Sequence, residues 1–182
     1  MLDVVVVSFV IAFLRRGRIR EMPQFHSLWA LGISILLQIG SAFVGEYAGL
    51  LVSISYVFTL LFFYSNREHE DMRIFMIGWL LNALVIWANY GRMPVDLEQA
   101  TKVPFPLETL IAGTDFKHVL LNEETNLPFL ADFIYKPFYF KRVISIGDLF
   151  VILGTFLLVQ RIMNKPLSLI RLREGKQYAP KH

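Results

Sequence analysis

Amide, hydroxyl and charged side chains recur at helical spacing inside three apolar segments of this chain. They are Ser34, Gln38 and Ser41; Asn82, Asn89 and Arg92; and Ser145, Asp148 and Thr155. Within each segment the spacings are three, four or seven residues, which places the side chains on one face of a helix. Polar groups within a bilayer are costly and often functional. We therefore expect the three faces to converge on one polar patch.

The charged members of this patch suggest an ion pair. Asp148 would have to protonate or find a partner inside a bilayer, and Arg92 is the nearest cation by depth. A guanidinium–carboxylate pair, supported by Asn89, would fix how two helices dock. Two other interpretations stay open. The polar side chains can serve only as contacts between helices, or they can form a pocket in which Arg92 binds an anionic headgroup or a small solute.

Asp132, in the connection before the last apolar segment, adds a second candidate acid. Either Asp132 or Asp148 could act as a base on a lipid-linked substrate, but no nucleophile elbow, glycine-rich phosphate loop or His-Glu-x-x-His motif accompanies them. The candidate binding residues are therefore Gln38, Ser41, Asn82, Asn89, Arg92, Asp132, Ser145 and Asp148. We assign none of them a catalytic role, and the sequence favours a non-enzymatic protein.

The residue types that bind metals are scattered or missing. The four histidines are His26, His69, His118 and His182, and no two of them are four residues apart. The chain has no cysteine, which removes thiol catalysis, iron–sulfur clusters and disulfides. We therefore expect no metal and no cofactor.

The composition is typical of an integral membrane protein. Hydrophobic residues make up 55% of the 182 residues and charged residues 18%, against about 45–50% and about 25% in a soluble domain. The mean hydropathy is +0.50. These values argue against a soluble globule, a disordered chain and a disulfide scaffold. They also argue against a nucleic-acid-binding module, so we expect the lipid bilayer as a partner and no nucleic acid.

The polar faces need long helices to position them. A bilayer core requires about 20 mostly apolar residues as a helix, and four segments approach this length: 28–45, 47–64, 74–90 and 143–160. A fifth, 2–14, is short and spans only if Arg15 and Arg16 snorkel; an interfacial helix is the alternative. The sequence predicts an all-α integral membrane protein, a bundle of five transmembrane helices formed by residues 1–164.

The distribution of positive charge predicts how this bundle is oriented. With the N-terminus outside the cell membrane and the C-terminus in the cytoplasm, 12 of the 18 Lys and Arg residues face the inside. The 47 residues 96–142 then form an extracytoplasmic loop. A loop this long and this apolar is expected to be ordered, as a cap on the outer headgroups or as a lid over a site. Residues 165–182 form a basic cytoplasmic tail.

Four short runs resemble a family of small bacterial integral-membrane proteins of unknown function. They are Arg-Arg-Gly-Arg at 15–18, Asn-x-x-Arg-Met-Pro-Val at 89–95, Leu-Pro-Phe-Leu-Ala-Asp at 127–132 and Ser-Ile-Gly-Asp at 145–148. The resemblance implies a bacterial inner-membrane protein with an Asn/Arg/Asp signature at its outer leaflet.

These observations together predict a non-enzymatic multi-pass membrane protein. One form of this hypothesis is an accessory or structural subunit. The other is a protein whose outer-leaflet polar patch binds another membrane protein or an anionic lipid headgroup. A small solute carrier and a membrane enzyme acting on a lipid-linked substrate are the alternatives.

Overall fold

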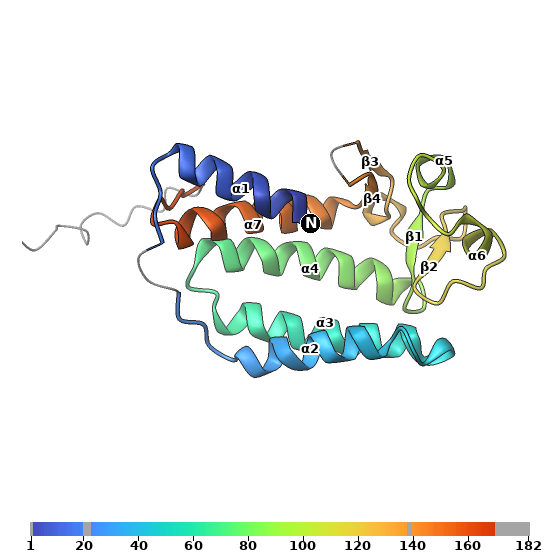
Figure 1. The fold of residues 1–182 in the computed structure, drawn as a ribbon. Helices are drawn as coiled ribbons and strands as arrows, with labels where there is room; N and C mark the ends of the chain where they lie inside the picture. The colour runs from blue at the N-terminus through green and yellow to red at the C-terminus, as the bar shows by residue number, and fades with distance from the viewer. Residues whose placement is uncertain (1, 20–22, 138–139, 170–182) are drawn as a thin grey trace, which may run out of the picture.

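Five long helices dominate the structure, a computed structural model that describes residues 2–19, 23–137 and 140–169 (Figure 1). They are α1 (Leu2–Leu14), α2 (Leu28–Gly40), α3 (Ala48–Ser65), α4 (Glu70–Ala88) and α7 (Ile146–Ile162), with the short 3-10 turn η1 (Gly45–Tyr47) leading into α3. Figure 1 shows the five helices aligned along one direction. Their main contacts join them in the order α1–α7–α4–α3–α2, so the first helix packs against the last.

The lengths of these helices separate them into two groups. The continuous helical segment Gly45–Ser65 and helix α4 are long and apolar enough to cross a membrane. Helices α1 and α2 have 13 residues each and α7 has 17, which corresponds to about 20 Å and about 26 Å. The structure is therefore mostly helical, with two helices that satisfy the length of a membrane span on their own.

Three helix ends differ from the predicted segments by three residues or more. Helix α4 starts at Glu70 rather than at 74, and at the other two ends polar side chains cap the helix. Helix α2 ends at Gly40 rather than at residue 45, and the Ser41 hydroxyl donates to the Gln38 carbonyl there (2.7 Å). Helix α7 starts at Ile146 rather than at 143. Ser145 and Asp148 form a capping box: the Ser145 Oγ accepts from the Asp148 amide (3.0 Å) and the Asp148 carboxylate accepts from the Ser145 amide (3.3 Å). Asp148 thus lies in the first turn of α7, not deep within a span.

The prediction of an all-α protein is wrong for the segment between α4 and α7, residues 89–145, here called the α4–α7 connection. It contains β1 (Met93–Val95), parallel to β2 (His118–Leu120), and β3 (Ile134–Lys136), antiparallel to β4 (Arg142–Ile144). Helices α5 (Leu97–Ala100) and α6 (Leu107–Ile111) and the 3-10 turn η2 (Pro128–Leu130) complete it. Buried Val95, Ala100 and Leu110 give it a small core of its own. Strands of three residues are too short for alternation of polar and apolar side chains to reveal them.

Polar side chains are buried between the helices, and large apolar side chains point outward. Ser34 and Thr59 are almost completely buried and hydrogen-bond to each other across α2 and α3 (2.5 Å). In contrast, Phe13 is 72% exposed and Leu36 is 69% exposed. Soluble monomers rarely expose large contiguous apolar areas. The outer surface of the helices is therefore suited to an apolar environment.

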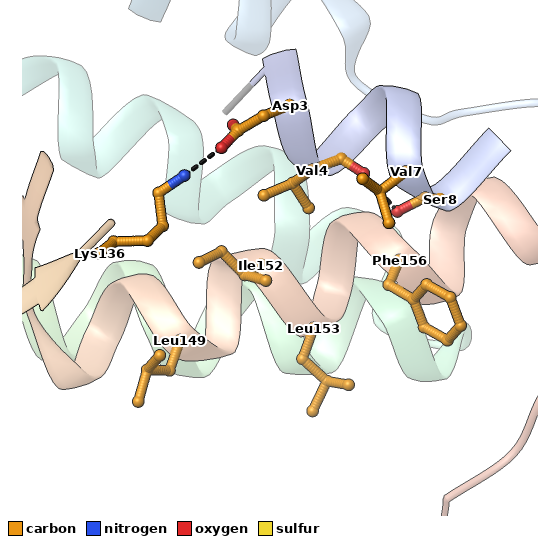
Figure 2. Close-up of a pocket in the computed structure, with 9 residues that line it drawn as sticks. All are labelled: Asp3, Val4, Val7, Ser8, Lys136, Leu149, Ile152, Leu153 and Phe156. Atoms are coloured by element: carbon orange, nitrogen blue, oxygen red, sulfur yellow. Dashed lines mark hydrogen bonds and ion pairs between the residues drawn. The ribbon is translucent and has the colours of Figure 1, made fainter. Parts of the chain in front are cut away.

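Polar contacts hold α1 against β3 at its start and against α7 further along. Near its start, Asp3 pairs with Lys136 of β3. The buried Gln160 side chain of α7 donates to the carbonyl of Ser8 in the middle of α1 (3.0 Å) and accepts from Arg15, which follows the helix. Figure 2 shows the apolar groove between the two helices, a cavity of about 420 Å³ with the Asp3–Lys136 pair at one end.

Candidate functional site

The site is positioned by a close crossing of α4 and α7. A Cβ atom added at Gly147 would lie 2.7 Å from the Gly78 carbonyl oxygen, and one added at Gly154 would lie 2.9 Å from the Phe75 ring. Small residues at such positions let two helix backbones approach closely. The crossing therefore brings Asn82, one turn after Gly78, directly against the start of α7.

Three of the predicted residues form one hydrogen-bonded network at this crossing. The Ser145 Oγ donates to the Asn82 Oδ1 (2.8 Å), and the Asn82 Nδ2 donates to the Asp148 Oδ1 (3.1 Å). The capping box adds the amide of Ser145 as a further donor to the same carboxylate. The Asp148 carboxylate is consequently held in one place by donors from both helices.

This carboxylate lines a polar cavity of about 220 Å³, here called the inner cavity. Four predicted residues line it, and they come from four parts of the chain: Gln38 from α2, Asn82 from α4, Asp148 from α7 and Asp132 from the α4–α7 connection. Tyr56, Lys117 and His118 also line it. The structure thus brings together one residue from each of the three predicted polar faces and Asp132, and the binding role of this group stays a prediction.

A second cavity, of about 550 Å³, adjoins the first and is here called the outer cavity. The two cavities share His118 and Asp132, so these side chains stand between them. The outer cavity adds Lys141 and Arg142, whose residues are exposed, and the ring of Phe105. The inner cavity is therefore lined by two carboxyl groups and one cation, Lys117, and the outer cavity by Asp132 and two cations, Lys141 and Arg142.

Asp132 is the group in this site whose hydrogen bonding is incomplete. Its backbone is fixed, because its amide donates to the Pro94 carbonyl and its carbonyl accepts from the Asp96 amide (both 2.9 Å). Its Oδ1 is buried, and no described residue donates to it. Burial raises the pKa of this carboxyl well above its ordinary value of 3.8, and the nearby Asp148 carboxylate adds to the increase.

His118 is held at the boundary of the two cavities by its neighbours. Its ring packs edge-on against Phe105, with 5.0 Å between the ring centroids, and its Nδ1 lies 3.2 Å from the Asp115 carboxylate. Burial raises the pKa of Asp115, but the backbone amide of Lys117 and the charge and backbone amide of His118 outweigh it, so the net pKa is lowered. Asp115 thereby orients His118 rather than serving the cavities itself.

Four predicted residues line neither cavity. Ser145 caps α7, as described above, and the other three have contacts elsewhere. Ser41 caps α2, as described above. Asn89 joins α4 to the α4–α7 connection, because its side chain donates to the Asn126 carbonyl (2.9 Å) and accepts from the Asn126 amide (3.0 Å). Arg92 is half-buried, and among the described residues no ion pair joins it to Asp148. The predicted Arg92–Asp148 pair is therefore wrong: Asn82 and Ser145 take the contacts of Asp148.

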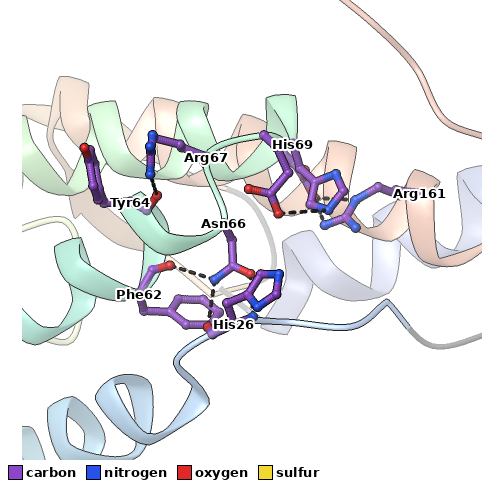
Figure 3. A network of polar contacts seen from close by, with 9 residues as sticks. His26, Phe62, Tyr64, Asn66, Arg67, His69 and Arg161 are labelled. Carbon is purple, nitrogen blue, oxygen red and sulfur yellow. Dashed lines mark hydrogen bonds and ion pairs between the residues drawn. The ribbon is translucent and has the colours of Figure 1, made fainter.

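Sequence reasoning missed a polar network at the opposite end of the helices (Figure 3). There the Asp71 carboxylate, almost fully buried, accepts from the Nε and Nη2 of Arg161 (3.0 and 2.8 Å). Nearby, the buried Asn66 side chain donates to the carbonyl of His26 (2.9 Å) and accepts from its amide (2.8 Å). The spacing of residues in the sequence could have indicated this network. Asp71 lies on the same helix face as Gly78 and Asn82, and Arg161 lies on the same helix face as Gly154, seven residues before it.

Comparison with known proteins gives relatives without an assigned activity. Residues 22–160, which include α2, α3, α4, α7 up to Gln160 and the whole α4–α7 connection, match the family described as "Family of unknown function (DUF5317)". A Thermotoga maritima protein described as "Uncharacterized protein" is 32% identical over 161 residues, which cover 86% of this chain and 88% of the relative. No solved structure shows significant similarity to the chain.

Proposed function

The chain belongs to the DUF5317 family, a family of unknown function, and we propose that it is a non-enzymatic multi-pass membrane protein that binds a polar headgroup or small polar ligand in its inner and outer cavities. One observation carries this proposal: residues from four separate parts of the chain build a single polar cavity at one end of an apolar helix array.

Several features support placing all five long helices in a bilayer. Large apolar side chains cover the outward faces of α1, α2 and α3, and two helical segments have the length of a span. The shorter α1 and α2 fit a bilayer if flanking residues snorkel or the lipid thins locally. Helix α1 is followed by Arg15 and Arg16, which suit this arrangement.

The ends of the array support an orientation with the N-terminus outside. The Asp3–Lys136 pair places the start of α1 beside the α4–α7 connection, at one end of the array. The described cations at the other end are Arg15, Arg16, Arg18, Arg67, Arg73, Arg161 and Lys165. The connection end holds six described Lys and Arg residues, so the described residues differ by only one; over the full sequence 12 of the 18 fall on the proposed cytoplasmic side. An excess of Lys and Arg is typical of the cytoplasmic side, so we propose that the cavities open on the outer side.

A second candidate function is a membrane enzyme acting on a lipid-linked substrate. The observation in its favour is Asp132, because a buried carboxylic acid with a raised pKa is suited to proton transfer. Ligand binding is favoured over this alternative because, among the described residues, no hydroxyl hydrogen-bonds to the His118 ring, and Asn82 and Ser145 hold Asp148. Neither group is thereby directed at a nucleophile.

Labelling of single cysteines tests the orientation, since the chain has no cysteine of its own. Thr101→Cys lies in the α4–α7 connection, and Arg67→Cys lies between α3 and α4; both residues are exposed. We expect a membrane-impermeant maleimide to label Thr101→Cys in intact spheroplasts and Arg67→Cys only after permeabilisation. Labelling of Arg67→Cys in intact spheroplasts would contradict the orientation, and equal labelling of both would contradict the membrane embedding.

Filling the inner cavity tests the binding function. We expect the variant Gln38→Phe, whose ring occupies the cavity, to lose most of the lipid or solute that the wild-type protein retains when extracted gently from native membranes. Native mass spectrometry measures this retention. Ile39→Phe is the matched control, because Ile39 is the next residue of α2 and is 57% exposed. Equal retention by both variants and the wild type would exclude the cavity as the binding site.

A further inference from the structure

We infer that the ligand is a zwitterion, with a primary ammonium group bound beside Asp132 and Asp148 in the inner cavity and a phosphate group bound by Lys141 and Arg142 in the outer cavity. This inference rests on the proposed function and names the chemical class of its ligand. It replaces the purely anionic headgroup expected from Arg92, which lines neither cavity.

The inner end of the site requires a positive charge with N–H donors. It holds two carboxyl groups, those of Asp132 and Asp148, and the single ammonium group of Lys117. No ion pair joins Lys117 to either carboxylate among the described residues, and the Asp132 Oδ1 is buried without a donor. A buried acceptor without a donor is costly. An ammonium group carries three N–H donors, so it can satisfy Asp132 and still reach Asp148.

The outer end of the site requires a negative charge. Lys141 and Arg142 are exposed side by side in the sequence, at the start of β4, and no described residue forms an ion pair with either. Arginine and lysine bind phosphate well, arginine through two parallel N–H donors. Both cavities meet at His118 and Asp132. The inference requires that one small molecule extends past these two side chains from one cavity into the other.

Two sources carry this chemistry. One is the headgroup of an aminophospholipid such as phosphatidylethanolamine, and the other is free phosphoethanolamine. Close relatives of the ligand lack one required feature. A choline headgroup has a quaternary ammonium without N–H donors, and a glycerol headgroup has phosphate without any cation.

The test is a binding titration of the purified full-length protein in detergent, with short-chain phosphatidylethanolamine, phosphatidylcholine and phosphatidylglycerol and with free phosphoethanolamine. We expect the ethanolamine compounds to bind about tenfold or more tightly than the choline and glycerol lipids, as loss of a charge-assisted hydrogen bond implies. We expect Asp132→Asn to remove this preference. The double variant Lys141→Gln with Arg142→Gln should weaken every phosphate compound by a similar factor. Glu123→Gln and Lys102→Gln, both at exposed positions outside the cavities, should bind as the wild type does.

The outcomes separate this inference from the proposed function. Equal binding of the ethanolamine and glycerol lipids would overturn the zwitterion and leave a headgroup-binding protein. No binding of any compound would overturn both. Binding of the lipid alone, or of free phosphoethanolamine as well, supports the inference and identifies the source. If Asp132→Asn fails to fold, the exposed Lys141 and Arg142 variants decide: unchanged binding of phosphate compounds by them would overturn the assignment.

Discussion

Replacement of Gly147 by alanine is expected to destabilise the protein by about 3 kcal/mol, the upper range for overpacking of a tight contact. The added Cβ would lie 2.0 Å from the Asn82 Oδ1 and 2.7 Å from the backbone oxygen of Gly78. The Asn82 side chain can move, but the Gly78 backbone can move only if α4 and α7 separate. The gain in helix propensity from alanine, about 1 kcal/mol, is too small to compensate.

Thermal unfolding in detergent, followed by circular dichroism, measures this effect. Gly32→Ala is the matched control, because Gly32 lies within α2 and a Cβ there would meet no atom within 4 Å. We expect this control to unfold at the wild-type temperature or above it. If Gly147→Ala also unfolds there, the crossing of α4 and α7 is not as close as the structure has it.

Replacement of Arg161 by leucine is expected to cost about 3–5 kcal/mol, because it leaves the Asp71 carboxylate buried without its cation. Asp71 is only 3% exposed, and among the described residues Arg161 supplies both side-chain hydrogen bonds that its carboxylate accepts. The double variant Asp71→Leu with Arg161→Leu should recover much of the loss, because it removes both charges together. Chemical unfolding in detergent gives both values.

Arg67→Leu is the control for this pair. Arg67 is exposed, stacks over the Tyr64 ring at 3.9 Å and donates to the Tyr64 carbonyl. Contacts of this kind on a surface contribute about 1 kcal/mol or less. A loss in Arg161→Leu no larger than that in Arg67→Leu would show that the Asp71–Arg161 pair does not stabilise the fold.

Much of the helical framework could be predicted from the sequence, because apolar segments of helix length leave few alternatives. Segments 2–14, 28–45, 47–64, 74–90 and 143–160 each overlap one long helix. Their ends could not be read from hydropathy alone. Ser145 and Asp148, interpreted as intramembrane polar groups, are the cap of α7, and a capping box was the signal that would have shown this. The strands arise from pairing between distant three-residue segments, which leaves no local pattern.

The sequence allowed us to predict the cavity-lining residues that lie on helices. It did not allow us to predict those that the α4–α7 connection contributes. Gln38, Asn82 and Asp148 meet in the inner cavity, as their helix faces indicate. Asn89 and Arg92 were predicted to share this face of α4, but α4 ends at Ala88 and both residues lie just beyond it. There the Asn89 side chain hydrogen-bonds to Asn126 of the connection. The cations of the site, Lys117, Lys141 and Arg142, also come from the connection. The membrane depth and the sequence spacing of residues do not show how an irregular segment folds back onto the helices. The predicted tail lies mostly beyond residue 169 and so outside the described residues.

The packing of α1 against α7 has a consequence for biosynthesis. The ribosome makes α1 first and α7 last, and the contact between Ser8 and Gln160 joins residues 152 positions apart. Helix α1 therefore has no contact with α7 until nearly the whole chain has been translated. Contacts between such distant residues form slowly. A prematurely terminated chain would leave the polar groups of α1 unsatisfied, and a protease could recognise it by them.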